Sequence, residues 1–76
     1  MEKEIMVLLE ELKPGEVFSE SLSFIDDGLL DSFEVVALVS MLEEKYGIEI
    51  DGLDIIPDNF QSIATIIQLV KKSKRA

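Results

Sequence analysis

Apolar residues recur with helical spacing in three separate stretches of this chain. In the first and last stretches they fall at i, i+3, i+4 and i+7, a pattern typical of a helix with one buried face. The sequence therefore predicts a helix from about Glu2 to Lys13 and another that begins after Ser62, a good capping residue. The apolar positions are Ile5, Leu8, Leu9 and Leu12 in the first helix, and Ile63, Ile66, Ile67 and Val70 in the last.

The longest predicted helix occupies residues 32–46. The turn-forming run at residues 26–28, Asp-Asp-Gly, comes shortly before it, and Gly47 is placed to end it in a left-handed conformation. This arrangement delivers Ser32 to the first turn of the helix, with Asp31 just before it. The core-facing stripe of this helix is Val35, Leu38, Val39, Leu42 and Tyr46.

The remaining segments have no sustained periodicity. Residues 14–31 form a long connection that we expect to pack over the core, with room for one short helical turn. Residues 48–51 alternate like a strand, but a lone strand has no partner, so we interpret them as a loop whose isoleucines fill the core. The connection carries six large apolar side chains: Phe18, Leu22, Phe24, Ile25, Leu29 and Leu30.

A short helical turn is predicted where Pro57 precedes Phe60, because proline suits the first position of a helix and Phe60 can pack inward. Beyond the last helix, the basic tail is expected to fray. Three helices and one short helix in 76 residues predict a single all-α domain, residues 1–76.

Composition excludes several classes of function. The chain has no cysteine and no histidine, so it lacks thiolate ligands and the usual general base. Neither glycine-centred acidic loop has the ligand spacing of a calcium-binding EF-hand, and we predict no metal site. No apolar run is long enough to span a bilayer, and the amino terminus is unlike a signal peptide, so we expect a cytoplasmic protein.

Charge is distributed unevenly. The net charge is −9, and residues 14–58 contain twelve acidic side chains and one basic side chain, Lys45. Such a surface repels nucleic acids and anionic membranes and favours encounter with basic protein surfaces. Acidic faces that only keep a small protein in solution would explain the charge equally well.

Ser32 is the most interesting polar residue for chemistry. It lacks an activating base, which makes it a poor catalytic nucleophile, and we predict no catalytic residue in the chain. As an attachment point it is well placed, since a phosphate ester there would meet the unpaired N–H groups and positive dipole of a helix amino terminus. The alternative is that Asp31 or Ser32 is an ordinary helix cap.

A second, partly apolar patch lies near the start of the long helix, away from its core stripe. It could be extra core, because a central helix can be buried on two sides, or a docking surface, because it adjoins Ser32 and has a charged rim. We favour docking. The residues are Phe33, Val36, Ala37 and Ser40, bounded by Glu34, Glu43 and Glu44.

Several motifs in this order resemble the acyl carrier proteins and the related peptidyl carrier domains. The resemblance rests on the runs Gly-Leu-Leu-Asp-Ser-Phe at 28–33, Leu-Glu-Glu-Lys-Tyr-Gly-Ile-Glu-Ile at 42–50 and Pro-Asp-Asn-Phe at 57–60, and on Ser62-Ile63. Phe33 replaces the usual leucine or methionine, and Ala37 makes the helix less acidic than in carriers of fatty acid synthesis. The first run and Asn-Phe-Gln-Ser at 59–62 are more similar to small carriers such as the D-alanyl carrier proteins.

The resemblance implies an acyl-carrier-like bundle of three main helices plus one short helix, with a long loop between helices 1 and 2. It also implies 4′-phosphopantetheine attached to Ser32 by a phosphopantetheinyl transferase, with Asp31 as the family's acidic residue before the serine. The arm would carry acyl or aminoacyl groups as thioesters, and the long helix would be the recognition helix for partner enzymes.

The expected partners are therefore the transferase and an acyl- or aminoacyl-activating ligase or synthase with a basic docking surface. We expect a monomer that is not itself an enzyme and binds no nucleic acid. The alternative function is an unmodified acidic helical adaptor for a basic protein. A hydrolase that uses Ser32 would need a base that the sequence does not contain.

Overall fold

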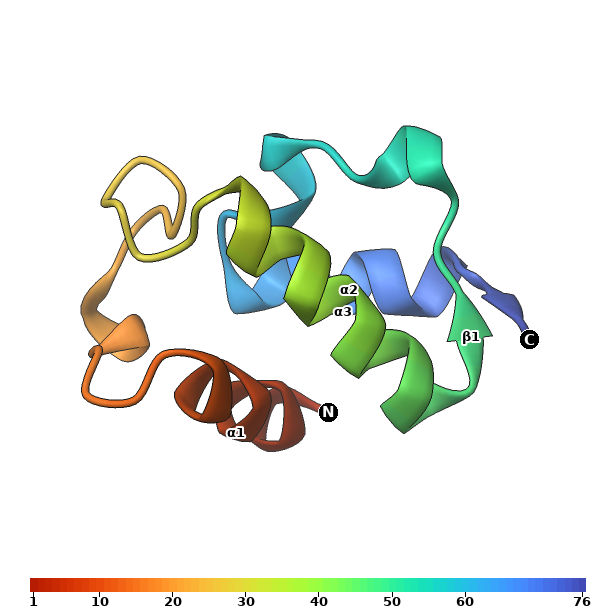
Figure 1. Cartoon of the computed structure of the whole chain (residues 1–76), viewed down its shortest axis with the longest axis horizontal. Helices are drawn as coiled ribbons and strands as arrows, with labels where there is room; N and C mark the ends of the chain where they lie inside the picture. The colour runs from red at the N-terminus through yellow and green to blue at the C-terminus, as the bar shows by residue number, and fades with distance from the viewer.

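A computed structural model describes all residues, 1–76, and contains three α-helices. They are α1 (Glu2–Leu12), α2 (Ser32–Tyr46) and α3 (Ile63–Lys72). The chain has little strand, and its helices lie close together around one core (Figure 1). The predicted all-α, acyl-carrier-like class with a long loop between the first two helices is confirmed.

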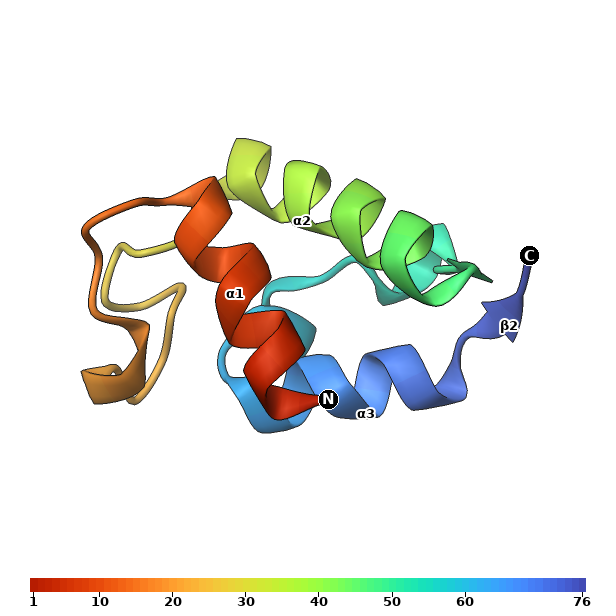
Figure 2. The same ribbon diagram turned by 90° about the horizontal axis from the view of Figure 1, so that it is seen from below.

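Helix α1 packs against both α2 and α3. In Figure 2 it runs diagonally in front of them, from α3 at its amino end towards the start of α2 at its carboxyl end. It buries Ile5 and Leu9 completely, as the spacing predicts. At the far end of α2, the Tyr46 hydroxyl donates a 2.9 Å hydrogen bond to Glu4 Oε1 of α1. Burial and this hydrogen bond raise the pKa of Tyr46 to about 12, so its hydroxyl stays protonated and can donate the bond even at alkaline pH.

The predicted core stripe of α2 is confirmed for its first four residues, because Leu38 and Leu42 are fully buried and the two valines nearly so. Tyr46, the last residue of the stripe, is only partly buried and packs against the core. Gly47 ends the helix in the left-handed region, with φ of 61°, a conformation that costs glycine least. The buried residues form one cluster from all parts of the chain: Ile5, Leu8, Leu9, Phe18, Phe24, Leu30, Val35, Leu38, Val39, Leu42, Ile48, Ile50, Phe60, Ile66, Leu69 and Val70.

The connection between α1 and α2 packs over the core and contains one short 3₁₀ turn, η1 (Phe18–Glu20). The rings of Phe18 and Phe24 meet edge to face, with centroids 5.2 Å apart. Leu22 is the exception among the six large apolar residues of this connection, since it is 96% exposed. Leu22 lies in a turn that the Ser21 hydroxyl closes by donating a 2.6 Å hydrogen bond to Asp27 Oδ2.

Two expectations for the carboxyl-terminal half were wrong. Ile48–Glu49 is a strand, β1, and the tail supplies its antiparallel partner, β2 (Lys74–Arg75), so the tail is paired. The Ala76 N–H also donates to the Gly47 carbonyl at 2.9 Å. The partner strand lies far along the chain and has no apolar alternation, so local pattern does not reveal it.

The segment between β1 and α3 contains two 3₁₀ turns, η2 (Gly52–Asp54) and η3 (Pro57–Phe60). The second confirms the predicted short helix, and Phe60 is fully buried. The Asn59 side chain donates a 2.7 Å hydrogen bond to the Asp54 carbonyl and joins the two turns. None of the helices combines the length and apolar character needed to cross a bilayer.

Candidate functional site

The start of α2 is capped by Asp31, and this leaves the neighbouring hydroxyl free. Asp31 Oδ1 accepts a 2.9 Å hydrogen bond from the Glu34 N–H, and Glu34 Oε1 accepts one of 2.9 Å from the Asp31 N–H, a complete capping box. Ser32 is exposed, and its hydroxyl makes no hydrogen bond within the chain. Of the two capping candidates, only Asp31 has that role.

The backbone around Ser32 suits a bound anion. The N–H groups of Ser32 and Phe33 have no acceptor in the chain, because the first bonds of the helix are made by the next two residues. The amino terminus of the fifteen-residue helix also carries partial positive charge. A phosphate ester on this hydroxyl would therefore fit without displacing any hydrogen bond that the protein already makes.

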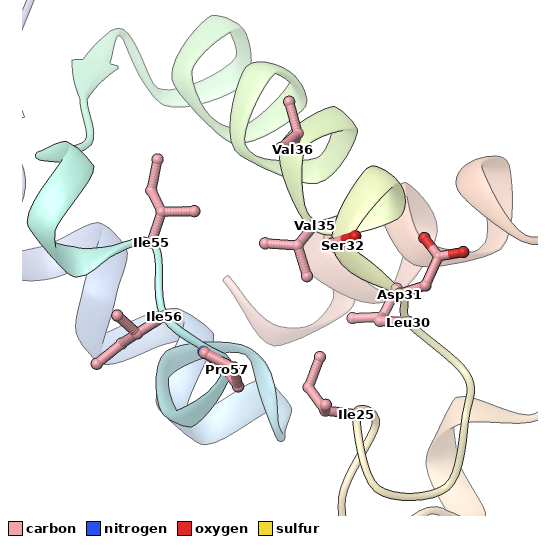
Figure 3. A pocket seen from close by; sticks show the side chains of 9 residues that line it. All are labelled: Ile25, Leu30, Asp31, Ser32, Val35, Val36, Ile55, Ile56 and Pro57. Carbon is pink, nitrogen blue, oxygen red and sulfur yellow. The ribbon is translucent and has the colours of Figure 1, made fainter.

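An apolar pocket of about 430 Å³ adjoins Ser32. Figure 3 shows its side chains converging from three segments, with the Asp31 carboxylate pointing away from Ile55 and Ile56. The pocket extends the site from one hydroxyl to a surface that can receive an apolar group. Its lining residues are Ile25, Leu30, Asp31, Ser32, Val35, Val36, Ile55, Ile56 and Pro57.

Sequence reasoning missed the far wall of this pocket. Ile55 and Ile56 belong to the segment between η2 and η3, more than twenty positions after Ser32. The only local signal was a pair of isoleucines before a proline, which holds the preceding residue in an extended conformation. Which part of the molecule that pair faces depends on the tertiary fold.

The second patch on α2 is exposed and is not extra core. Phe33 is 85% exposed and Val36 is 60% exposed, while Ala37 is half-buried. We call these three residues the docking patch. They occupy the first two turns of the helix, directly after Ser32, and Val36 also lines the pocket.

The acidic rim of the docking patch is less available than the sequence suggests. Glu34 pairs with Lys13 at 3.0 Å in addition to its capping bond, and this hydrogen-bonded pair raises the pKa of Lys13. Glu43 Oε2 accepts a 3.0 Å hydrogen bond from the Ile50 N–H and so fixes the turn after the helix. Of the three rim glutamates, only Glu44 is exposed and makes no hydrogen bond or ion pair within the chain.

A family model and several known proteins are similar to this chain over most of its length. The family model described as "Phosphopantetheine attachment site" matches residues 5–70. An acyl carrier protein of Wolinella succinogenes is 41% identical over 70 residues, covering 91% of this chain and 83% of that protein. An acyl carrier protein of Sulfurovum sp. is 39% identical over 69 residues, covering 91% of this chain and 84% of that protein.

A D-alanyl carrier protein of Abiotrophia defectiva is 32% identical over 74 residues, covering 95% of this chain and 94% of that protein. No solved structure matches the chain. The family model and the relatives each span most of the chain, including the start of α2. The chain therefore belongs to the acyl carrier protein family, and its cofactor is 4′-phosphopantetheine.

Proposed function

We propose that residues 1–76 form one carrier domain in which Ser32 holds 4′-phosphopantetheine and presents acyl or aminoacyl groups to partner enzymes. The observation that carries the assignment to Ser32 is its free, exposed hydroxyl beside two unpaired N–H groups, with the capping role taken by Asp31. The cofactor supplies a terminal thiol for thioester formation, which accounts for a carrier without cysteine.

Attachment follows from simple bond exchange. The Ser32 oxygen forms a new bond to the phosphorus next to pantetheine in coenzyme A, the pyrophosphate bond breaks, and the adenosine bisphosphate leaves. The hydroxyl proton must pass to a base on a phosphopantetheinyl transferase, because no basic side chain of this protein contacts Ser32. The chain is thus the substrate of that enzyme and contributes no catalytic residue of its own.

The pocket beside Ser32 supports a carrier of apolar or partly apolar cargo. Three segments of the chain line this pocket with isoleucine, leucine and valine side chains, and Ser32 lines it too. Both acyl and D-alanyl carriers occur among the relatives. We therefore propose a cytoplasmic, monomeric carrier served by an acyl- or aminoacyl-activating ligase or synthase.

The attachment is tested by mass spectrometry. The purified protein is incubated with coenzyme A, Mg²⁺ and a promiscuous phosphopantetheinyl transferase. We expect the mass to increase by one phosphopantetheine, with the added group on the peptide that contains Ser32. An unchanged mass, under conditions that label a known carrier protein, would favour the unmodified acidic adaptor instead.

We propose that the docking patch makes the main contact with partners, with Asp31 and the start of α2 orienting the arm. Exposed aromatic and aliphatic side chains near the centre of an interface usually supply most of its binding energy. Glu44 is free to meet a basic partner, whereas Glu34 and Glu43 act mainly through their local field because each already bonds within the chain. The contact between the docking patch and a partner should therefore depend more on apolar side chains, and less on the acidic rim, than the sequence alone predicts.

Replacing Phe33 by alanine should weaken the contact with the transferase about tenfold, as loss of a buried aromatic anchor does elsewhere. The measurement is the carrier concentration that gives half-maximal transfer rate. Leu22→Ala is the matched control, because Leu22 is also a large apolar residue in solvent, 96% exposed, but lies outside the docking patch. If the two variants behave alike, or if added salt weakens the wild-type contact more than Phe33→Ala does, the docking surface is assigned wrongly.

A further inference from the structure

One carboxylate links helix α1 to the residue that precedes Ser32. Glu34 Oε2 pairs with Lys13 Nζ at 3.0 Å, while Glu34 Oε1 accepts the Asp31 N–H at 2.9 Å. The two side chains of the pair are only 27% and 19% exposed. Lys13 follows the last residue of α1, so the contact joins two elements that are separate in sequence.

We propose that Lys13 is a positioning residue for the modification of Ser32, an inference that rests on the proposed function. By holding Glu34, Lys13 fixes the capping box and with it the direction in which the Ser32 hydroxyl is offered to the transferase. Lys13 acts through Glu34 and Asp31 and does not touch the reacting atoms.

The amino terminus of α2 needs side chains such as Glu34 and Lys13 to hold it in place. The first turn of a helix lacks backbone bonds from its own N–H groups and frays unless side chains hold it. Here the Glu34 side chain supplies one of the two hydrogen bonds of the capping box. If that were its only bond, the Glu34 side chain would keep much of its rotamer freedom. A second bond to a partly buried lysine removes that freedom, and group transfer is sensitive to small errors in the placement of the attacking atom.

If Lys13 acted only through its charge, a different result would be expected. Lys13→Met would uncover a negative charge beside Ser32, and a basic transferase would then bind more tightly. Positioning instead predicts a slower transfer step within the complex. The two roles therefore separate in kinetics, since the first changes the half-saturating concentration and the second changes the maximal rate.

The experiment measures single-turnover transfer from coenzyme A to the full chain at increasing transferase concentration. For Lys13→Met we expect the maximal rate to fall about threefold, a modest effect in keeping with a partly exposed ion pair. Lys13→Arg should restore it. Glu34→Gln keeps an oxygen that can accept the Asp31 N–H but loses the ion pair, and it should slow transfer as much as Lys13→Met.

The double variant should then be no slower than either single one, because both changes remove the same interaction. Lys72→Met is the matched control, since it breaks the other ion pair of the chain, Lys72 with Asp54 at 3.0 Å, far along the sequence from Ser32. All variants are assayed at a temperature at which circular dichroism shows them folded. Should Lys13→Met fail to fold, Glu34→Gln against Lys72→Met decides the question.

An unchanged maximal rate in folded Lys13→Met or Glu34→Gln overturns the inference, as does an equal loss in Lys72→Met. A lower half-saturating concentration alone would assign Lys13 to charge and not to positioning. If the wild-type chain accepts no phosphopantetheine at all, the proposed function fails first. A labelled wild type with indifferent Lys13 variants defeats only the present inference.

Discussion

Replacing Ser32 by alanine is expected to abolish the gain of phosphopantetheine that the wild-type chain shows with coenzyme A and a transferase. The alanine variant keeps the Asp31 cap and the helix start, because the Ser32 hydroxyl makes no hydrogen bond in the fold. Alanine also has the higher helix propensity, so the variant should fold at least as well. Intact-mass spectrometry should therefore find folded protein that remains unmodified.

Ser19→Ala provides the control for this result. Ser19 is also exposed, and its hydroxyl makes no hydrogen bond within the chain. It lies, however, in the three-residue turn η1 and not at the start of a long helix. The Ser19 variant should gain the full mass increment. Modification of Ser32→Ala, or loss of modification in Ser19→Ala, would show that the attachment point lies elsewhere.

The parts of the site that sequence predicted are those governed by local rules. The stripe of α2, the cap before Ser32 and the glycine after Tyr46 each depend on residues within a turn or two of one another. The same is true of Ser62, whose hydroxyl accepts from the Thr65 N–H at 3.2 Å. Such short-range signals can be read without knowing how distant segments pack, and they placed Ser32 correctly at a helix start.

The parts that sequence did not predict depend on contacts between distant segments. The strand pair of Ile48–Glu49 with the tail, the Ile55–Ile56 wall of the pocket and the ion pair of Lys13 with Glu34 all join separate elements. Taken locally, each of these residues can be interpreted as part of a loop, as a core residue or as the end of a helix. Only the fold reveals that two of the three features lie beside Ser32.

Replacing Phe60 by alanine is expected to lower the free energy of unfolding by about 3–5 kcal/mol, the usual cost of emptying a buried aromatic site. Phe60 is fully buried and ends η3, so its ring anchors the segment that forms one wall of the pocket. A domain of this size has roughly 5–10 kcal/mol of stability in total. Urea unfolding followed by circular dichroism should show a midpoint far below that of the wild type, or a chain that is partly unfolded without urea.

Phe33→Ala makes the same chemical change at an exposed position, and it should alter the free energy of unfolding by less than about 0.5 kcal/mol. The two phenylalanines thus have different roles. Phe60 stabilises the core that shapes the site, whereas Phe33 lies in solvent beside Ser32. Equal destabilisation by both substitutions would mean that Phe33 packs into the core, and the docking patch would lose its anchor. A stable Phe33→Ala variant with impaired transfer would instead connect the exposed ring to partner binding, because the ring would then contribute to the contact and not to the fold.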